Sequence, residues 1–331
     1  MNTRPRNRGI DLLKYVCAFL VVCIHMAYPG KVWLEPLSRF AVPIFFMITG
    51  FFYADTCRRG KEDAQIRKIL RLTLLANGLF LVWSALWSAV SSERSFTSLF
   101  SAKVWLDFLL LNDSPFSGHL WYLGALLYVL VLIRLFEKKW DRRMLYPLIP
   151  LLLAANLLLG TYARSLFGVE LPRVYSRNFL LAGLPFFLLG DLLRSHSKAY
   201  SVPLLLAWIA LSALGTSLEN FLLLRTDLLV NKDLFLSTPA LAVALFLLVI
   251  RCAPFFDRPI LTRVCHFVAP LSVYIYIFHP ILDALTHKGV KILGTFLPAI
   301  PELYKLCSPI VVFTVCTAFA WLADKCKGRK A

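Results

Sequence analysis

The chain has 331 residues, of which 59% are hydrophobic, and its mean hydropathy of +0.68 excludes an ordinary soluble domain. A net charge of +17 would suggest nucleic acid as the partner of a soluble protein. Here the basic residues cluster between apolar runs, so membrane topology explains them and we expect no nucleic-acid partner. The eight Cys form no C-x-x-C pair, and we interpret them as buried free thiols, with neither a disulfide framework nor a metal site.

Ten apolar runs, each near the length that a bilayer requires, follow one another along the chain. They predict an all-α, polytopic membrane protein with a single transmembrane domain over residues 1–331 and no separate soluble domain. The predicted spans are 10–28, 40–54, 66–90, 119–136, 145–162, 178–194, 202–218, 234–251, 266–286 and 304–323. The segment from Phe96 to Leu111 is too polar for a span, and we expect an amphipathic or re-entrant helix there.

The distribution of Lys and Arg predicts the orientation of these spans. With the N-terminus inside, 23 of the 36 Lys and Arg residues fall in inner segments and 12 in outer ones, while Lys14 lies within the first span. Basic residues are enriched on the cytoplasmic side of membrane proteins. We therefore expect both termini in the cytoplasm, in a multi-pass protein of the bacterial cytoplasmic membrane.

Asp11, Lys14 and His25 interrupt the otherwise apolar first span. Ionisable groups within a span cost free energy and normally face a cavity or a partner, which makes them functional candidates. Lys14 and His25 are eleven residues apart, almost three helical turns, so they share one helix face and are separated by roughly 16 Å along the axis. Asp11 precedes Lys14 by three residues, where an ion pair can form.

Three His residues, His25, His119 and His279, fall at a similar depth near the outer ends of their spans. His25 is the best candidate for a general base, because a neutral imidazole accepts a proton near physiological pH; the alternative is a structural His bonded between helices. Asp283 follows His279 by one turn and can orient its ring, although an anchor near the membrane surface is an equal alternative. The aromatic residues after His119 are typical of an interfacial helix start.

Basic side chains also gather near the inner ends of the early spans. Lys68 and Arg71 lie three residues apart on one helix face, and Lys14 lies near the same side of the membrane. Such a group can hold a polyphosphate donor through charge-assisted hydrogen bonds. The positive-inside rule explains the flanking basic residues equally well, but it explains Lys14 less well because that residue lies within its helix.

Five segments, in chain order, give the sequence a specific resemblance. They are the Lys14-x10-His25 spacing, RFAVPIFFMITGFF in the second span, KILR (Lys68 to Arg71), GHLWYLGALLY (Gly118 to Tyr128) and LSVYIYIFHPI (Leu271 to Ile281). Together they resemble the acyltransferase-3 family of integral membrane acyltransferases. Lys14 is a departure, since many members have Arg there; the family tolerates either residue, but Lys cannot make a bidentate fork.

The resemblance implies a membrane O-acetyltransferase that moves an acetyl group from cytoplasmic acetyl-CoA to a hydroxyl of a surface glycan, a lipid-linked sugar or another cell-envelope acceptor. It also assigns site residues: the catalytic His25, the donor-binding Lys14, Lys68 and Arg71, and the acceptor-side Arg39, His119 and His279. The alternative is a transporter of a small polar solute such as an amino acid, because membrane domains that resemble this family occur fused to racemases. Charged groups are equally expected in a translocation path.

Overall fold

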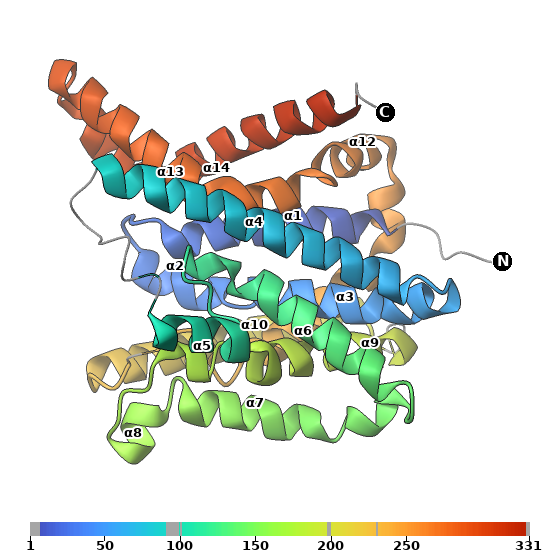
Figure 1. The fold of residues 1–331 in the computed structure, drawn as a ribbon. Coiled ribbons are helices and arrows are strands. Elements are labelled where there is room, and N and C mark those ends of the chain that lie inside the picture. Colours follow the sequence, from blue (N-terminus) through green and yellow to red (C-terminus); the bar gives the residue numbers. More distant parts are fainter. Residues whose placement is uncertain (1–6, 91–98, 100, 197–199, 230, 329–331) are drawn as a thin grey trace. The chain divides into compact units, whose positions relative to one another are not determined.

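The computed structural model describes residues 7–90, 99, 101–196, 200–229 and 231–328, and helices dominate these ranges (Figure 1). No strand occurs in them, which confirms the all-α prediction. Each of the ten apolar runs coincides with a helix. The physical reason is that a helix satisfies its backbone hydrogen bonds internally, which a chain in contact with lipid requires. A helix also occupies residues 102–111, within the segment where an amphipathic or re-entrant helix is expected, whereas residues 96–98 and 100 lie outside the described residues.

Several of these helices suit a multi-pass membrane protein. Among the described residues, six helices are long and apolar enough to cross a membrane, or seven if the bent pair Pro259–Val268 and Leu271–Phe296 is one span. The first helix falls outside this count because its 18 residues include Arg8, Asp11 and Lys14. The helices at 184–196 and 238–251 fall outside it because 13 and 14 residues reach only about 20 Å. The ten-span count and the orientation therefore stay predictions.

The chain forms two compact units, one of residues 1–44, 197–217 and 237–331, the other of residues 45–196 and 218–236. The helices of the first unit are α1 (Arg8–His25), α2 (Lys31–Ser38), α11 (Thr238–Arg251), α12 (Pro259–Val268), α13 (Leu271–Phe296) and α14 (Ala299–Gly328). Those of the second are α4 (Glu62–Val90), α5 (Ala102–Leu111), α6 (Trp121–Phe136), α7 (Leu148–Leu159), α8 (Ala163–Phe167) and α9 (Leu184–His196). The remaining helices, α3 (Ala41–Arg58) and α10 (Val202–Arg225), supply residues to both units.

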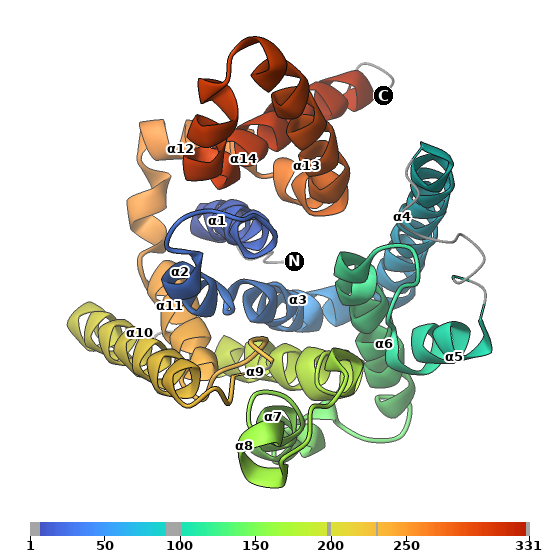
Figure 2. The same ribbon diagram turned by 90° about the vertical axis from the view of Figure 1, so that its left-hand side faces the viewer.

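Helix α1 is the centre of the first unit. It contacts α2, α11, α12, α13 and α14, and Figure 2 shows it beside the hairpin that α13 and α14 form. Ala18 and Val22, one turn apart on α1, pack in a core with Ile275 of α13 and with Val312 and Cys316 of α14. Burial of each large apolar side chain in such a core contributes roughly 1.5–3 kcal/mol. The position of α1 is therefore fixed by apolar contacts on several sides.

Two buried ion-pair networks tie together the helix ends of the second unit. Arg142 donates to Asp191 at 2.7 Å and also to Glu137, and the Tyr146 hydroxyl donates to Asp191 at 2.8 Å. Separately, Arg194 makes two 2.7 Å hydrogen bonds to Asp55. Buried charges need such partners to offset their desolvation. These charges are satisfied within the protein, and we interpret them as structural.

Helices α3 and α9 approach each other closely at two glycines. A Cβ atom on Gly50 would lie 1.9 Å from the Phe187 carbonyl oxygen, and one on Gly190 would lie 2.0 Å from that of Met47. Distances this short leave no room for a side chain, so the backbones themselves are in contact. Small residues at such crossings are typical of helix packing in membranes.

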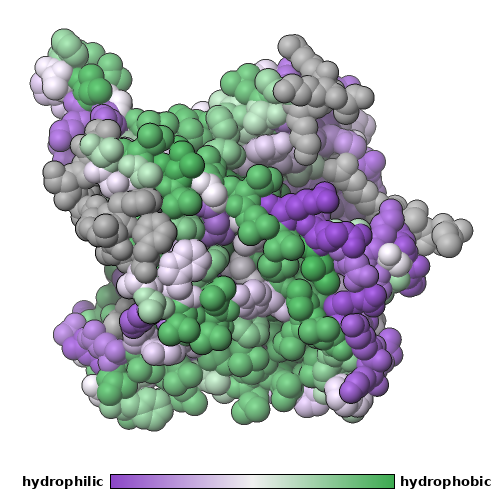
Figure 3. Space-filling model, in the orientation of Figure 1, coloured by the Kyte–Doolittle hydropathy of each residue, from purple (hydrophilic) through white to green (hydrophobic). Residues whose placement is uncertain are grey.

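The outward faces of the second unit are apolar. Figure 3 shows hydrophobic residues along α4 and α7. The exposed apolar side chains on these two helices are Leu70, Leu74, Leu75, Val82, Leu86, Leu148, Leu151, Leu158 and Leu159. A continuous apolar face of this kind is unfavourable in water, so we interpret it as a lipid-facing surface.

The glycine contacts generate a stability prediction. Gly190→Ala should destabilise the protein by about 1–3 kcal/mol, because the added methyl must push the α3 backbone away. The measurement is the temperature at which detergent-purified protein loses its monodisperse elution peak. Gly78→Ala on α4 is the matched control, since a Cβ there meets no atom within 4 Å. Equal melting temperatures for both variants would contradict the assignment of a tight crossing.

Candidate functional site

Two of the three candidate histidines lie against each other in the first unit. The ring centroids of His25 and His279 are 5.1 Å apart, with 43° between the ring planes. His25 comes from the last turn of α1, and His279 from the middle of α13. His279 is completely buried, whereas His25 is exposed. The fold thus brings together two imidazoles, one of which is accessible to a substrate.

The backbone of α13 holds the buried His279 ring in place. The Nδ1 atom of His279 lies 2.9 Å from the Tyr276 carbonyl oxygen and 3.2 Å from that of Ile275. Pro280 has no N–H, so it cannot make the helical bond that residue 280 would otherwise donate to Tyr276. A carbonyl oxygen only accepts, so Nδ1 must carry the proton and Nε2 is left as the proton-accepting atom of the ring. The neighbouring proline thereby selects the tautomer of His279.

Asp283 interacts elsewhere than at His279. Its carboxylate interacts with His287 and with the Tyr304 hydroxyl of α14. The spacing in the sequence suggested that Asp283 orients the His279 ring. In the structure, backbone carbonyl oxygens hold that ring instead. The His-Pro pair at 279–280 is the sequence feature that could have predicted bonding of the His279 ring to the backbone.

Lys14 lies on α1 in an ion pair with Asp11. Their Nζ and Oδ1 atoms are 3.3 Å apart, and the Lys14 side chain is 30% exposed while that of Asp11 is 10% exposed. The partly open ammonium group therefore retains access to a ligand. Tyr15 bonds to Thr317 at 2.9 Å, and Ser308 donates to the Ala27 carbonyl oxygen at 2.7 Å, so α14 is bonded to the middle of α1 and to the residues just after its C-terminal end.

Arg39, the fourth candidate in the first unit, lies at the end of α2. Its guanidinium is paired with Glu35 one turn earlier, and both side chains are largely buried, at 11% and 12% exposure. Burial of the pair requires that each charge keep its partner, because an unpaired charge there would be strongly unfavourable. The geometry therefore gives Arg39 a structural role at the C-terminal end of α2.

His119 occupies a buried polar cluster in the second unit. It belongs to the short 3₁₀ turn η2 (Gly118–Leu120), is 6% exposed, and its Nδ1 lies 2.8 Å from the Ser117 hydroxyl. Its ring packs edge-on against Phe80 of α4 at 4.9 Å. Close by in sequence, Ser114 donates to Asn77 at 2.7 Å. From the sequence, His119 was predicted as an acceptor-side residue, with an interfacial helix start as the alternative. The polar residues within the neighbouring apolar runs are the signal that could have predicted these partners.

Lys68 and Arg71 are exposed near the beginning of α4. Arg71 precedes Phe80, the residue that contacts His119, by nine positions, or about 13 Å along the helix. In the second unit, Arg71 of α4 therefore lies about two and a half turns from the residue that contacts the His119 imidazole. In the described parts of the chain, no group of three or more His, Cys, Asp or Glu residues is placed to hold a metal ion.

Comparison with known proteins identifies relatives of this chain. A serine/alanine racemase of Enterococcus gallinarum is 28% identical over 317 residues, which cover 85% of this chain and 42% of the racemase. An amino-acid racemase of Enterococcus faecalis is 23% identical over 310 residues, with 87% and 42% coverage. The chain thus spans about two-fifths of the length of the curated relatives it matches.

No solved structure matches the chain. Residues 7–323 match the acyltransferase-3 family, which is described as an acyltransferase domain. This match includes all five segments on which the resemblance was based. The chain therefore belongs to the acyltransferase-3 family.

Proposed function

We propose that the protein is a membrane O-acetyltransferase. It would take the acetyl group of cytoplasmic acetyl-CoA and pass it to a hydroxyl of an extracytoplasmic glycan, a lipid-linked sugar or another envelope acceptor. In this proposal ten helices cross the cytoplasmic membrane with both termini inside, in line with the excess of Lys and Arg in the inner segments. Family membership supports the reaction class.

The contact between His25 and His279 carries this proposal. Acyl transfer to a hydroxyl requires a group that removes the hydroxyl proton, and a neutral imidazole is the side chain best suited to that step. His25 is exposed and therefore able to meet the acceptor, while the buried His279 lies against it with a fixed tautomer. In this arrangement His25 is the catalytic base and His279 positions it.

In the proposed step the acceptor hydroxyl reacts directly with acetyl-CoA. The acceptor hydroxyl gives its proton to the His25 imidazole while its oxygen attacks the thioester carbonyl of acetyl-CoA. The new ester C–O bond forms, the C–S bond breaks, and the coenzyme A thiolate leaves and takes the proton from the imidazolium. The products are an acetyl ester and coenzyme A, and no electrons are transferred to or from an outside reagent.

We assign donor binding to Lys14 on α1 and to Lys68 and Arg71 on α4. Lys14 is partly open beside Asp11, and Lys68 and Arg71 are exposed on α4. Within the described ranges, neither Lys68 nor Arg71 makes a salt bridge, in contrast to Arg142 and Arg194. Positive groups without an internal partner suit the phosphates of coenzyme A, which accept charge-assisted hydrogen bonds.

A transporter of a small polar solute is the second candidate. The relatives are named as racemases of serine, alanine or other amino acids, which suggests an amino-acid solute. Their matched portion is less than half of each racemase, so the named activity is not carried over to this chain. Under this reading Lys14, His25 and His279 would line a translocation path.

The first prediction concerns His25. His25→Ala and His25→Gln should both lower acetyl transfer at least a hundredfold, because Gln forms hydrogen bonds but cannot accept a proton at useful pH. Coenzyme A binding should persist, since Lys14 is about 16 Å away along α1. The measurement is mass spectrometry of envelope glycans from cells that express each variant. His266→Ala, an exposed His of α12, is the control. Near-normal acetyl transfer by His25→Gln would reject the role of His25 as the catalytic base.

The second prediction concerns the His279 tautomer. In protein with ¹⁵N-labelled His, the His279 signal should show a protonated Nδ1 and an unprotonated Nε2. Pro280→Ala restores a backbone donor to the Tyr276 carbonyl oxygen and should shift His279 toward a mixture of tautomers. The signal is assigned by its loss in His279→Gln, and Pro309→Ala in α14 is the control. An unprotonated Nδ1 in the wild type would contradict the assignment.

The third prediction concerns the donor. Arg71→Ala should weaken coenzyme A binding ten- to a hundredfold, since one charge-assisted contact contributes about 1.5–3 kcal/mol. Lys14→Arg should be tolerated, because Arg retains the charge. Calorimetry on detergent-purified protein measures both effects, with Lys138→Ala as a control that removes an exposed charge elsewhere. Unchanged affinity in Arg71→Ala would remove that residue from the donor site.

A further inference from the structure

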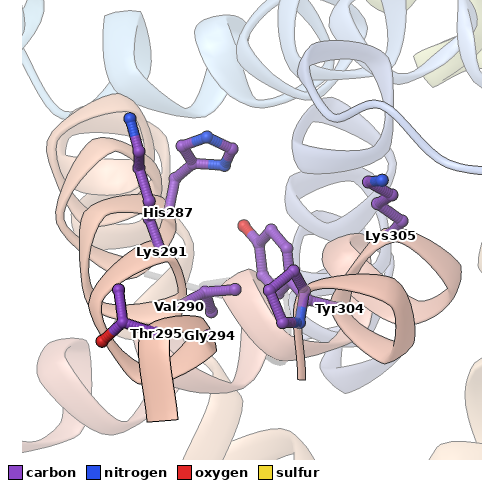
Figure 4. Close-up of a pocket in the computed structure, with 8 residues that line it drawn as sticks. His287, Val290, Lys291, Gly294, Thr295, Tyr304 and Lys305 are labelled. Atoms are coloured by element: carbon purple, nitrogen blue, oxygen red, sulfur yellow. The ribbon is translucent and has the colours of Figure 1, made fainter. Parts of the chain in front are cut away.

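A cavity of about 380 Å³ lies between α13 and α14 in the first unit (Figure 4). Its lining comes from one face of each helix, at the spacing of successive turns. These residues are His287, Val290, Lys291, Gly294 and Thr295 of α13, and Pro301, Tyr304 and Lys305 of α14. The volume is within the range of small-molecule sites.

Contacts at two levels of the hairpin bound this cavity. Toward the tip, a Cβ atom on Gly294 would lie 2.5 Å from Pro301, so the helices touch there. Farther from the tip, the rings of His287 and Tyr304 are 6.1 Å apart. Because both contacts join α13 to α14, the cavity is part of the packing of the hairpin.

The charged residues of the lining are basic. Lys291 and Lys305 line the cavity together with His287 and Tyr304, and no acidic residue is among the lining residues. Figure 4 shows His287 and Lys291 on one side and Tyr304 and Lys305 on the other. This set offers several hydrogen-bond donors from two sides, which suits an anion with several oxygens such as phosphate.

Two acidic residues lie near the cavity and reduce its positive charge. Glu302 pairs with Lys305 at 2.6 Å, in a pair whose side chains are both largely exposed. Asp283 interacts with His287 and Tyr304. Lys291 makes no salt bridge with any residue that the structure describes, so its charge is available to a ligand.

The tip of the hairpin has the composition of a segment that lies in the headgroup region of a membrane. Its exposed apolar side chains include Leu293, Phe296, Leu297 and Leu303, with exposures between 51% and 78%. Such residues favour the acyl boundary, while Lys side chains beside them reach toward lipid phosphates. This combination favours a phosphate that is carried by a lipid.

We propose that the cavity between α13 and α14 binds a phosphate group, supplied by the headgroup of an anionic lipid. The site is distinct from the histidine pair, because Lys291 lies about 18 Å beyond His279 along α13. It does not depend on acyl transfer, since lipid binding by Lys291 and Lys305 is equally compatible with transport.

Lipid binding by the full-length protein tests this proposal. Native mass spectrometry of detergent-purified protein measures binding of phosphatidylglycerol, with phosphatidylcholine for comparison and pyrophosphate as a soluble phosphate. The double variant Lys291→Ala/Lys305→Ala should bind phosphatidylglycerol at least tenfold more weakly. Lys288→Ala is the matched control, because Lys288 is exposed on the same helix but does not line the cavity.

Two further variants distinguish weaker binding that is caused by lost charge from weaker binding that is caused by misfolding. Lys291→Arg/Lys305→Arg should retain binding, and Val290→Trp should abolish it by filling the cavity while every charge remains. Pyrophosphate binding with the same variant dependence, in place of lipid binding, would support the phosphate site and assign it a soluble ligand. The proposal is overturned if Lys288→Ala weakens binding as much as the double variant does, or if Val290→Trp, eluting as folded protein, binds both ligands normally.

Discussion

Helix α1 must keep three ionisable groups within an apolar helix, and the architecture of the first unit depends on how these groups are satisfied. Asp11 and Lys14 pair with each other at 3.3 Å, while His25 lies against His279 of α13. Apolar contacts with α13 and α14 hold α1 in the position where His25 meets His279. Since an uncompensated ionisable group in an apolar environment is costly, packing and polar pairing stabilise the same arrangement.

Basic residues that pair with carboxylates within the protein have a different role from basic residues whose charge can bind a ligand. Arg142 is bound to the buried Asp191 and Arg194 to the partly buried Asp55, and these pairs stabilise the fold. Lys68, Arg71 and Lys291 carry charges that the described protein does not neutralise, which is the condition for binding an anionic ligand. The proposed donor site and the proposed phosphate cavity both follow from this distinction.

The proline at position 280 of α13 explains how the tautomer of His279 is fixed. Pro280 would usually be a defect, because it leaves the Tyr276 carbonyl without the helical N–H donor. The adjacent His279 supplies a donor from its ring, and this bond fixes which nitrogen is protonated. A backbone constraint thereby sets the chemistry of a side chain without any carboxylate partner.

The sequence by itself determined the helices, because in lipid an apolar run must satisfy its backbone hydrogen bonds internally. It also identified Lys14, His25 and their shared face, since helical periodicity alone fixes them. It did not determine that α13 continues to Phe296, beyond the predicted end at residue 286, because polar residues outside the apolar core do not end a helix. Only the tertiary structure decided that His25 meets His279, that backbone carbonyls rather than Asp283 hold the ring, and that Arg39 is paired with Glu35. These contacts are set by packing between helices, and local periodicity carries no information about which helices become neighbours.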